Sequence, residues 1–487
     1  MKIVFVAPEI APFSKTGGLA DVVGSLPIEI QALGHKVYAF APRYKSVNIE
    51  KEGFELVIKK LPVALGSEME QARVFRYVDS KGVEFYFIDH PEFFGRDELY
   101  GTAMGDYPDN DQRFTLFQRG VLDTLKVLKI KPDVIHCHDW QTGLIPVYLK
   151  TLYAHEDVFQ KTKTVFTVHN LAYQGNFPPD SLPATGLTWD HFTIDRLEYY
   201  GKVNFLKGGL TYSDAISTVS ERYAKEIQTK DSGYGLEGVL SQRAEYLHGI
   251  LNGLDYEEWN PETDKALVAH YNAKNFKAKA LNKEALQKEN RLKVDPLIPV
   301  FGVVSRLVDQ KGIDVLIAAL DEMMAQGIQL VILGSGDEKY HQLFRDVAKH
   351  YVGQFGLHIV FDPKMAKHIY AGCDVMIIPS YYEPCGLAQM IALRYGTIPL
   401  VRAVGGLADT IQEFDPKSGK GNGFSFEDYT GRALMSAVKR CLSVYRDKKN
   451  WERLVQNGMA CDFSWTASAK KYIALYEETE RQSLKKI

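Results

Sequence analysis

Residues 14–33 of the chain read SKTGGLADVVGSLPIEIQAL, and this stretch joins a predicted strand to a predicted helix. The run Ile3–Ala7 before it is entirely apolar, which is typical of a buried parallel strand, and Pro8 and Pro12 end that strand. The apolar residues that follow the glycines at intervals of three and four are Leu19, Val22, Val23, Leu26, Ile30 and Leu33. This spacing predicts a helix with one apolar face.

The glycine turn itself predicts an anion site. Gly17 and Gly18 fall where the strand gives way to the helix, so unpaired backbone N–H groups and the positive end of the helix dipole lie there. Lys15 adds a full positive charge. A tight turn with a solvated lysine explains the same residues about equally well. The pattern matches neither GxGxxG nor GxxxxGK[ST], which disfavours a nicotinamide-binding fold and a P-loop NTPase.

The composition is that of a soluble globular protein. The 487 residues are too many for one core and predict two domains. With 45% hydrophobic and 24% charged residues, the chain has ample material for sizeable cores. It contains no apolar run of about 18 residues and no charged-then-apolar leader. We therefore expect a cytoplasmic protein that neither spans a membrane nor binds one.

Cysteine usage and charge exclude further classes. The five cysteines are odd in number and show no CxxC spacing, so neither a disulfide framework nor a structural zinc site is predicted, and a reducing compartment fits. A net charge of -3 provides no field for nucleic acid, so a polyanion would need local clusters of lysine and arginine.

Strands alternate with helical stretches along most of the chain. The first set is predicted over residues 3–7, 37–41, 134–137, 164–168 and 215–219, and the second over 300–304, 330–333, 359–361, 375–378 and 398–401. Each set predicts a parallel sheet wound on both faces. Residues 54–89 alternate apolar and polar in short pieces, which predicts a hairpin insertion. Two doubly wound domains imply a cleft between them.

Two clusters resemble metal sites. Asp109-Asn110-Asp111 has DxD spacing but precedes an apolar helical run, and such residues at a helix start are usually caps. His136 and His138 alternate at a strand end and could ligate a metal, but no third ligand is near, so polar residues delivered to a cleft are the favoured interpretation. Asp139 and the pair His169-Asn170 follow strands and should reach the same rim as Lys15.

The second predicted domain offers similar chemistry. Arg306 and Lys311 place two cations at a strand-to-helix turn, an arrangement suited to a diphosphate. Residues 383–387 read EPCGL and offer backbone N–H groups beside one carboxylate. Residues 405–409 read GGLAD and repeat residues 17–21. The repeat suggests a duplicated phosphate-binding turn, although chance similarity explains it as well.

Several motifs together resemble the bacterial glycogen synthase and plant starch synthase family, in order along the whole chain. They are KTGGLAD, HCHDWQTG, TVHNLAYQG, ILNGLD, GVVSRLVDQKG, PSYYEPCGLAQM, VGGLADT and FSWTASAKKYIALY. The resemblance implies an α/β GT-B fold, in which two doubly wound Rossmann-like domains face a central cleft. It places an N-terminal acceptor-side domain at 1–250, a C-terminal donor domain at 251–460, and a helix at 461–487 that returns to the first domain.

The resemblance also implies a reaction. Members transfer glucose from a nucleotide donor, usually ADP-glucose, to the nonreducing 4-hydroxyl of an α-1,4-glucan such as glycogen, with retention of configuration and without a metal or other cofactor. It implies catalytic roles for His169, Arg306, Lys311 and Glu383. The residues it implies for substrate binding are Lys15, Gly18, Asp21, Asp139, Asn170, Asn252, Phe361, Cys385, Gly386, Leu387 and Thr410.

The sequence departs from related patterns at two positions. Many retaining GT-B enzymes carry a second glutamate eight residues after the first, but Ile391 stands there, so Glu383 is expected to act without it. Phe361 stands where a tyrosine is expected near the nucleotide base, which leaves UDP-glucose open as the donor. A phosphorylase with pyridoxal phosphate, which would need a far longer chain, and a non-catalytic glucan- or nucleotide-binding protein are the remaining alternatives.

Overall fold

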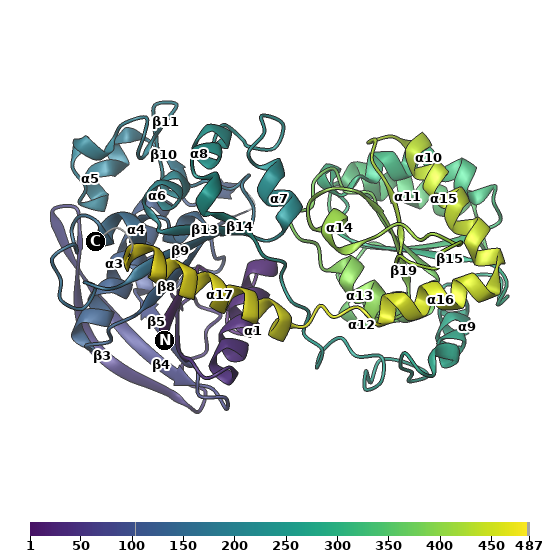
Figure 1. The fold of residues 1–487 in the computed structure, drawn as a ribbon, viewed down its shortest axis with the longest axis horizontal. Coiled ribbons are helices and arrows are strands. Elements are labelled where there is room, and N and C mark those ends of the chain that lie inside the picture. Colours follow the sequence, from purple (N-terminus) through teal and green to yellow (C-terminus); the bar gives the residue numbers. More distant parts are fainter. Residues whose placement is uncertain (103, 485–487) are drawn as a thin grey trace. The chain divides into compact units, whose positions relative to one another are not determined.

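The computed structural model describes residues 1–102 and 104–484, and these form two compact units. The first unit contains Met1–Gly253 and the chain from Trp465 onward, and the second contains Leu254–Ser464. Each unit is built around its own parallel sheet (Figure 1). The GT-B prediction of two Rossmann-like units is consistent with this arrangement of strands and helices.

The first unit is organised around a nine-stranded sheet whose order is β14-β13-β9-β8-β1-β2-β5-β4-β3. Its strands are β1 (Lys2–Val6), β2 (Lys36–Pro42), β3 (Phe54–Leu65), β4 (Glu68–Val78), β5 (Glu84–Asp89), β8 (Val134–His138), β9 (Lys163–Val168), β13 (Ala215–Thr218) and β14 (Leu247–Gly249). The seven strands from β14 to β5 run parallel, and β4 and β3 are antiparallel additions at one edge. The predicted hairpin insertion is therefore confirmed, and it widens the sheet.

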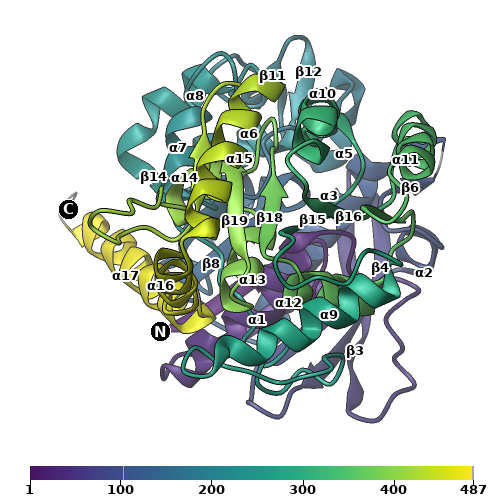
Figure 2. The same cartoon turned by 90° about the vertical axis from the view of Figure 1, so that its right-hand side faces the viewer.

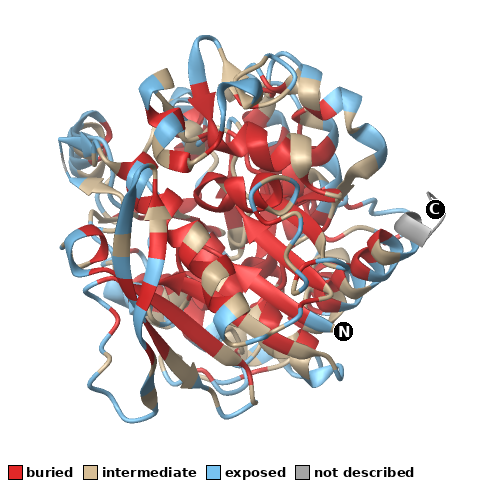
Figure 3. Ribbon diagram, turned by 90° about the vertical axis from the view of Figure 1, so that its left-hand side faces the viewer, coloured by how far each residue is buried: buried red, intermediate tan, exposed pale blue. Residues whose placement is uncertain are grey.

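Strand β1 lies inside this sheet, between β8 and β2, and Ile3–Val6 is fully buried. The buried central strands are visible in Figure 3. The helices of this unit are α1 (Gly18–Ala32), α2 (Pro91–Phe94), α3 (Asn110–Val127), α4 (Leu144–Leu149), α5 (Leu182–Thr185), α6 (Phe205–Tyr212), α7 (Glu221–Glu226), α8 (Glu237–Gln242) and α17 (Trp465–Leu484). Helix α1 buries the predicted apolar residues, Leu33 excepted, and α17 packs beside it through Trp465 and Tyr472.

The second unit contains a six-stranded parallel sheet in the order β17-β16-β15-β18-β19-β20. Its strands are β15 (Val300–Val304), β16 (Gln329–Leu333), β17 (Phe355–His358), β18 (Val375–Ile378), β19 (Ile398–Arg402) and β20 (Phe424–Phe426). Its helices are α9 (Lys279–Glu289), α10 (Ile313–Met324), α11 (Glu338–His350), α12 (Pro363–Gly372), α13 (Ala388–Arg394), α14 (Gly405–Thr410), α15 (Gly431–Arg446) and α16 (Lys448–Met459). Helices cover both faces of the sheet, with α10 and α15 together and α9 and α12 together (Figure 2).

One predicted strand is wrong. Residues 359–361 are apolar, but β17 ends at His358, because only Phe355–His358 pairs with β16. The next residues lead into α12, whose start is set by Asp362, since its carboxylate accepts hydrogen bonds from the backbone N–H groups of Lys364 and Met365. Phe361 is consequently a loop residue and is 86% exposed.

Candidate functional site

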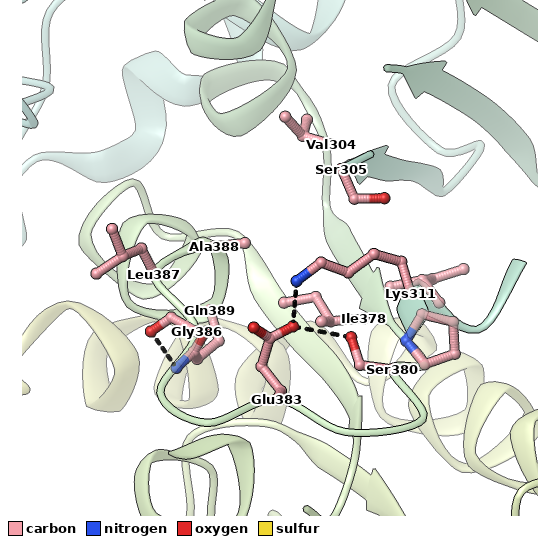
Figure 4. A pocket seen from close by; sticks show the side chains of 12 residues that line it. Val304, Ser305, Lys311, Ile378, Ser380, Glu383, Gly386, Leu387, Ala388 and Gln389 are labelled. Carbon is pink, nitrogen blue, oxygen red and sulfur yellow. Dashed lines mark hydrogen bonds and ion pairs between the residues drawn. The ribbon is translucent and has the colours of Figure 1, made fainter. Parts of the chain in front are cut away.

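The second unit contains a pocket at the carboxyl ends of β15 and β18, the edge at which open parallel sheets bind ligands. It is lined by Val304, Ser305, Lys311, Ile377, Ile378, Pro379, Ser380, Glu383, Gly386, Leu387, Ala388 and Gln389 (Figure 4). The structure thus brings together Lys311, Glu383, Gly386 and Leu387, which the sequence placed in one site. Cys385 is buried in the same turn.

Glu383 is held inside this pocket by two donors. Lys311 Nζ lies 2.5 Å from Glu383 Oε2, and the hydroxyl of Ser380 donates to the same oxygen at 2.9 Å. Glu383 is only 8% exposed and Ser380 is fully buried, so the carboxylate charge is desolvated but paired. Among the described residues, Oε1 has no partner of this kind. The side chain is therefore fixed through one oxygen while the other remains available.

Arg306 follows β15 and lies next to the pocket rather than in its lining. Its side chain is exposed, and its Nη2 donates to Oε1 of Gln310 at 3.0 Å. Lys311 comes five residues after Arg306, at the end of the short 3-10 helix η6 (Asp309–Lys311). The two predicted cations therefore flank one turn, as expected.

The turn after Glu383 is supported by buried groups from two sides. The backbone N–H of Gly406 donates to the carbonyls of Glu383 and Pro384, both at 3.1 Å. The side-chain amide of Gln389, fully buried, donates to the carbonyls of Cys385 and Gly386 at 3.0 Å each. The turn that carries Cys385, Gly386 and Leu387 is therefore held by its carbonyl oxygens.

The second GGLAD segment serves this support. A side chain at Gly405 would place its Cβ 2.0 Å from the carbonyl oxygen of Glu383, and one at Gly406 would lie 2.0 Å from that of Cys385. Thr410, predicted to bind substrate, donates its hydroxyl to the carbonyl of Gly406 at 2.6 Å and is buried. These residues therefore pack against the Glu383 turn and stabilise it.

The first GGLAD segment is open by comparison. A Cβ at Gly18 would meet nothing within 4 Å. Gly17 is the N-cap residue of α1 and has no side chain that could make a capping hydrogen bond. Lys15 Nζ forms an ion pair with Asp21 Oδ1 at 2.6 Å, with the two side chains 53% and 33% exposed. Space and an exposed cation at this helix start fit the predicted anion site.

Glu9 anchors this first turn, and the sequence analysis missed it. Its carboxylate accepts hydrogen bonds from the backbone N–H and the hydroxyl of Thr16. Glu9 is almost completely buried, and this burial raises its pKa above the usual value despite those two donors. A glutamate just after a buried strand carries no spacing signal that would have revealed this role.

Asp139 and His169 meet at the ends of β8 and β9, as predicted from their positions after two strands. The backbone N–H of His169 donates to Asp139 Oδ1 at 2.7 Å. Burial raises the pKa of Asp139 to about 7 and lowers the pKa of His169 to about 3. His169 is therefore a neutral imidazole at physiological pH.

The two histidines of β8 make hydrogen bonds with other side chains of the first unit. His138 is hydrogen-bonded through Nδ1 to His169 Nε2 at 2.9 Å, and His136 is bonded to the hydroxyls of Tyr476 at 2.8 Å and of Thr167. Both rings are fully buried, so His136 packs beneath α17 and reaches no cleft. Only His138 contributes to the strand end, by orienting His169.

The DxD segment is at a helix start, as expected, but its first carboxylate does not cap the helix. Asp109 occupies the N-cap position of α3 and makes no cap hydrogen bond, because Arg96 binds both of its oxygens. Within the described part of the chain, no three His, Cys, Asp or Glu side chains are grouped as a metal-ligand set.

The remaining predicted residues have varied surroundings. Asn170 accepts a hydrogen bond from the backbone N–H of Ala172 at 3.1 Å. Asn252 is buried, and its Oδ1 has no partner among residues 1–102 and 104–484. Phe361 is not part of the pocket lining. Sequence reasoning missed Ser380, Gln389 and Gln310, whose roles appear only when the turns around Glu383 are assembled.

No helix in the described part of the chain combines the length and apolar character that crossing a membrane requires.

The chain is similar to known proteins over nearly its whole length. Residues 2–242 match the family model of the starch synthase catalytic domain, and residues 282–459 match that of glycosyl transferases group 1. The chain is 50% identical to the glycogen synthase of Geotalea uraniireducens over 98% of both chains. It is 47% identical to that of Koribacter versatilis over 99% of both.

A solved structure is similar over the whole chain. The catalytic domain of starch synthase IV from Arabidopsis thaliana, bound to ADP and acarbose, has a TM-score of 0.88 and 34% identity, covering 98% of this chain and 99% of that one. A sucrose-phosphate synthase from Thermosynechococcus elongatus shares only the fold, with a TM-score of 0.58 and 17% identity over 98% of both chains. The chain belongs to the glycogen synthase and starch synthase family of GT-B glycosyltransferases.

Proposed function

We propose that the protein is a glycogen synthase that transfers glucose from ADP-glucose to the nonreducing 4-hydroxyl end of an α-1,4-glucan, with retention of configuration and release of ADP. The observation that carries the proposal is the pocket at the ends of β15 and β18, where Lys311 and Ser380 hold Glu383 through one oxygen. The ADP and acarbose bound by the Arabidopsis relative support a nucleotide donor and a glucan acceptor. We place the enzyme in the cytoplasm.

In the second unit, we assign Arg306 and Lys311 to the donor diphosphate. Charge-assisted hydrogen bonds to phosphate contribute roughly 1.5 to 3 kcal/mol each, and two cations beside one turn suit two phosphates. Gly386 and Leu387 line the same pocket, next to Cys385, and Thr410 supports their turn. Phe361, exposed on its loop, would stack on the nucleotide base.

In the first unit, we assign Lys15, Gly18, Asp21 and Asn252 to donor binding. The open space at Gly18 would let a phosphate oxygen approach the backbone, and the unpartnered Oδ1 of Asn252 could accept a hydrogen bond from a ligand hydroxyl.

His169 and Asp139 are assigned to the transferred glucose and to the acceptor, with Asn170 beside them. A neutral His169 hydrogen-bonds a sugar hydroxyl without adding positive charge. Burial keeps Asp139 near its titration point at neutral pH, so it can accept hydrogen bonds or hold a proton.

The mechanism must stabilise the departing diphosphate while keeping the anomeric configuration. Arg306, Lys311 and Lys15 supply positive charge for this purpose without a metal. A double displacement would want a second carboxylate near Glu383, and the buried Ile391 stands eight residues on. We therefore favour attack from the same face, in which the acceptor hydroxyl passes its proton to the leaving phosphate. The available Oε1 of Glu383 would then stabilise the positive charge that develops on the sugar ring.

The donor is tested by comparing kcat/KM for ADP-glucose and UDP-glucose with glycogen as acceptor, because specificity is the ratio of these values. We expect ADP-glucose to be preferred and UDP-glucose to be tolerated. UDP-glucose is the second candidate because Phe361 offers the base a ring but no hydroxyl. A preference for UDP-glucose would overturn the donor assignment, and the absence of transfer from either donor would overturn the proposed function.

A further inference from the structure

Gln310 connects the two segments that build the pocket of the second unit. Its side-chain Oε1 accepts a hydrogen bond from Arg306 Nη2 at 3.0 Å, and its Nε2 donates to the carbonyl of Tyr382 at 3.4 Å. Its backbone carbonyl accepts from the N–H of Tyr381 at 2.9 Å. One residue therefore joins the turn that bears Arg306 and Lys311 to the segment that ends in Glu383.

Arg306 depends on this contact for its direction. The arginine is exposed and has several rotatable bonds, and among the described residues Gln310 is the only hydrogen-bond partner of its guanidinium. Lys311 is fixed separately, by its ion pair with Glu383. Without the amide of Gln310, Lys311 would keep its position, whereas Arg306 would sample many rotamers.

The fold of the turn does not need the Gln310 side chain. The backbone N–H groups of Lys311 and Gly312 donate to the carbonyls of Val308 and Asp309, both at 3.0 Å, and these bonds close the turn. The side chain of Asp309 binds Lys339 and Tyr340, outside the pocket lining. A change at Gln310 should therefore alter the site more than the stability of the unit.

We propose that Gln310 is a positioning residue for sugar transfer, which holds the guanidinium of Arg306 toward the leaving diphosphate and ties it to the Glu383 segment. The inference rests on the proposed function, since it needs a diphosphate to leave at this site. Positioned donors act in the transition state because their orientation is set before the reaction. Losing the positioning should lower kcat while leaving KM for the donor within a few-fold.

The test is a double-mutant cycle between Gln310→Met and Arg306→Ala, because a residue that acts through another has no effect once its partner is gone. Methionine has a similar length to glutamine and makes no strong hydrogen bond. Gln310→Met should lower kcat about tenfold in the wild-type background and less than twofold in the Arg306→Ala background. Gln310→Asn keeps the amide but is one methylene shorter, so it should resemble Gln310→Met.

Asp309→Asn is the matched control, since it changes a polar side chain on the same turn outside the pocket lining, and it should leave kcat within twofold. Circular dichroism checks that all variants fold. Equal effects of Gln310→Met with and without Arg306, or wild-type activity of Gln310→Asn, would overturn the positioning role alone. Absence of transfer by the wild-type enzyme from both nucleotide donors would instead overturn the proposed function, and the role of Gln310 with it.

Discussion

The segment GGLAD occurs twice in the chain, and its two copies have opposite surroundings. Both begin a helix, α1 at Gly18 and α14 at Gly405. In the first copy the space above Gly18 is empty, whereas in the second copy the carbonyl oxygens of the Glu383 turn occupy the space that a side chain would need. The missing side chains of the second copy make room for another part of the protein, whereas those of the first copy leave open space, where we propose that a ligand binds.

The residues around each copy match this difference. Lys15 stands two residues before the first copy, and Ala403 holds the same place before the second. In the second unit, the two cations that we assign to the donor diphosphate are Arg306 and Lys311, which lie in a different segment from the GGLAD copy. Identical sequences therefore predicted the same local element, but long-range partners decided what each element does.

The largest effects should come from removing the cations of the second unit. Arg306→Ala and Lys311→Ala should each lower kcat roughly a hundred- to a thousandfold with little change in KM, because charge on the diphosphate grows as the glycosidic bond breaks. Lys15→Ala, at the open first copy, should lower kcat and also raise KM, because we assign Lys15 to binding the donor in the ground state as well as in the transition state. Steady-state kinetics with ADP-glucose measures both constants. An increase in KM alone for Arg306→Ala and Lys311→Ala would contradict the assignment.

The two glycine copies should differ in their tolerance of alanine. Gly406→Ala places a Cβ 2.0 Å from the carbonyl oxygen of Cys385 and should lower the free energy of unfolding by about 1 to 3 kcal/mol. Gly18→Ala meets nothing within 4 Å and should change it by less than about 0.5 kcal/mol. Gly406 is the better probe because Gly405, with a φ of +44°, would add backbone strain. Urea titrations measure the free energy of unfolding of both variants. Equal destabilisation by the two substitutions would contradict the proposed difference between the two copies.

Glu9, whose carboxylate binds the turn before the first copy, should make the stability of the protein depend on pH. Burial raises the folded-state pKa of Glu9, so its contribution to stability is fully present below the unfolded value near 4.5 and is lost as pH rises through the folded pKa. Glutamine does not titrate and can still accept from Thr16. The stability of Glu9→Gln relative to wild type should therefore increase between pH 4 and pH 8. A difference that stays constant over this range would show that Glu9 is not perturbed.

The smallest effect on stability should come from the ion pair at the first copy. Lys15 and Asp21 are both partly exposed, and such pairs contribute about 1 kcal/mol or less. Asp21→Asn should leave thermal unfolding almost unchanged and should raise KM for the donor. A large loss of stability in this variant would mean that the ion pair at the first copy stabilises the fold rather than serving ligand binding.

Much of the architecture was predictable because it follows from local patterns. Apolar runs such as Ile3–Val6 and Val300–Val304 form buried parallel strands, and polar residues after them reach the same edge of each sheet. The strand predicted at 359–361 failed because Asp362 starts a helix there, a capping effect that hydrophobicity does not reveal. Asp109 does not cap α3 because its carboxylate is bound by Arg96, thirteen residues earlier in the chain.

Other parts of the site depended on contacts that no spacing encodes. The sequence placed Glu383 and Lys311 in one site, but their ion pair links residues 72 positions apart. Ser380 and Gln389 look like ordinary polar residues until the turn around Glu383 is formed. The second GGLAD copy, for which the sequence predicts a phosphate-binding turn, supports the turn around Glu383, because its glycines face carbonyl oxygens.

We propose that the Glu383 pocket of the second unit transfers glucose from ADP-glucose without a metal. The most direct test measures transfer of labelled glucose from ADP-glucose to glycogen in excess EDTA, for the wild-type enzyme and for Glu383→Gln. We predict full wild-type activity in EDTA and, for Glu383→Gln, a loss of roughly a hundredfold or more in kcat with little change in KM. A collapse of wild-type activity in EDTA that Mg²⁺ or Mn²⁺ restores, or wild-type rates in Glu383→Gln, would contradict the claim.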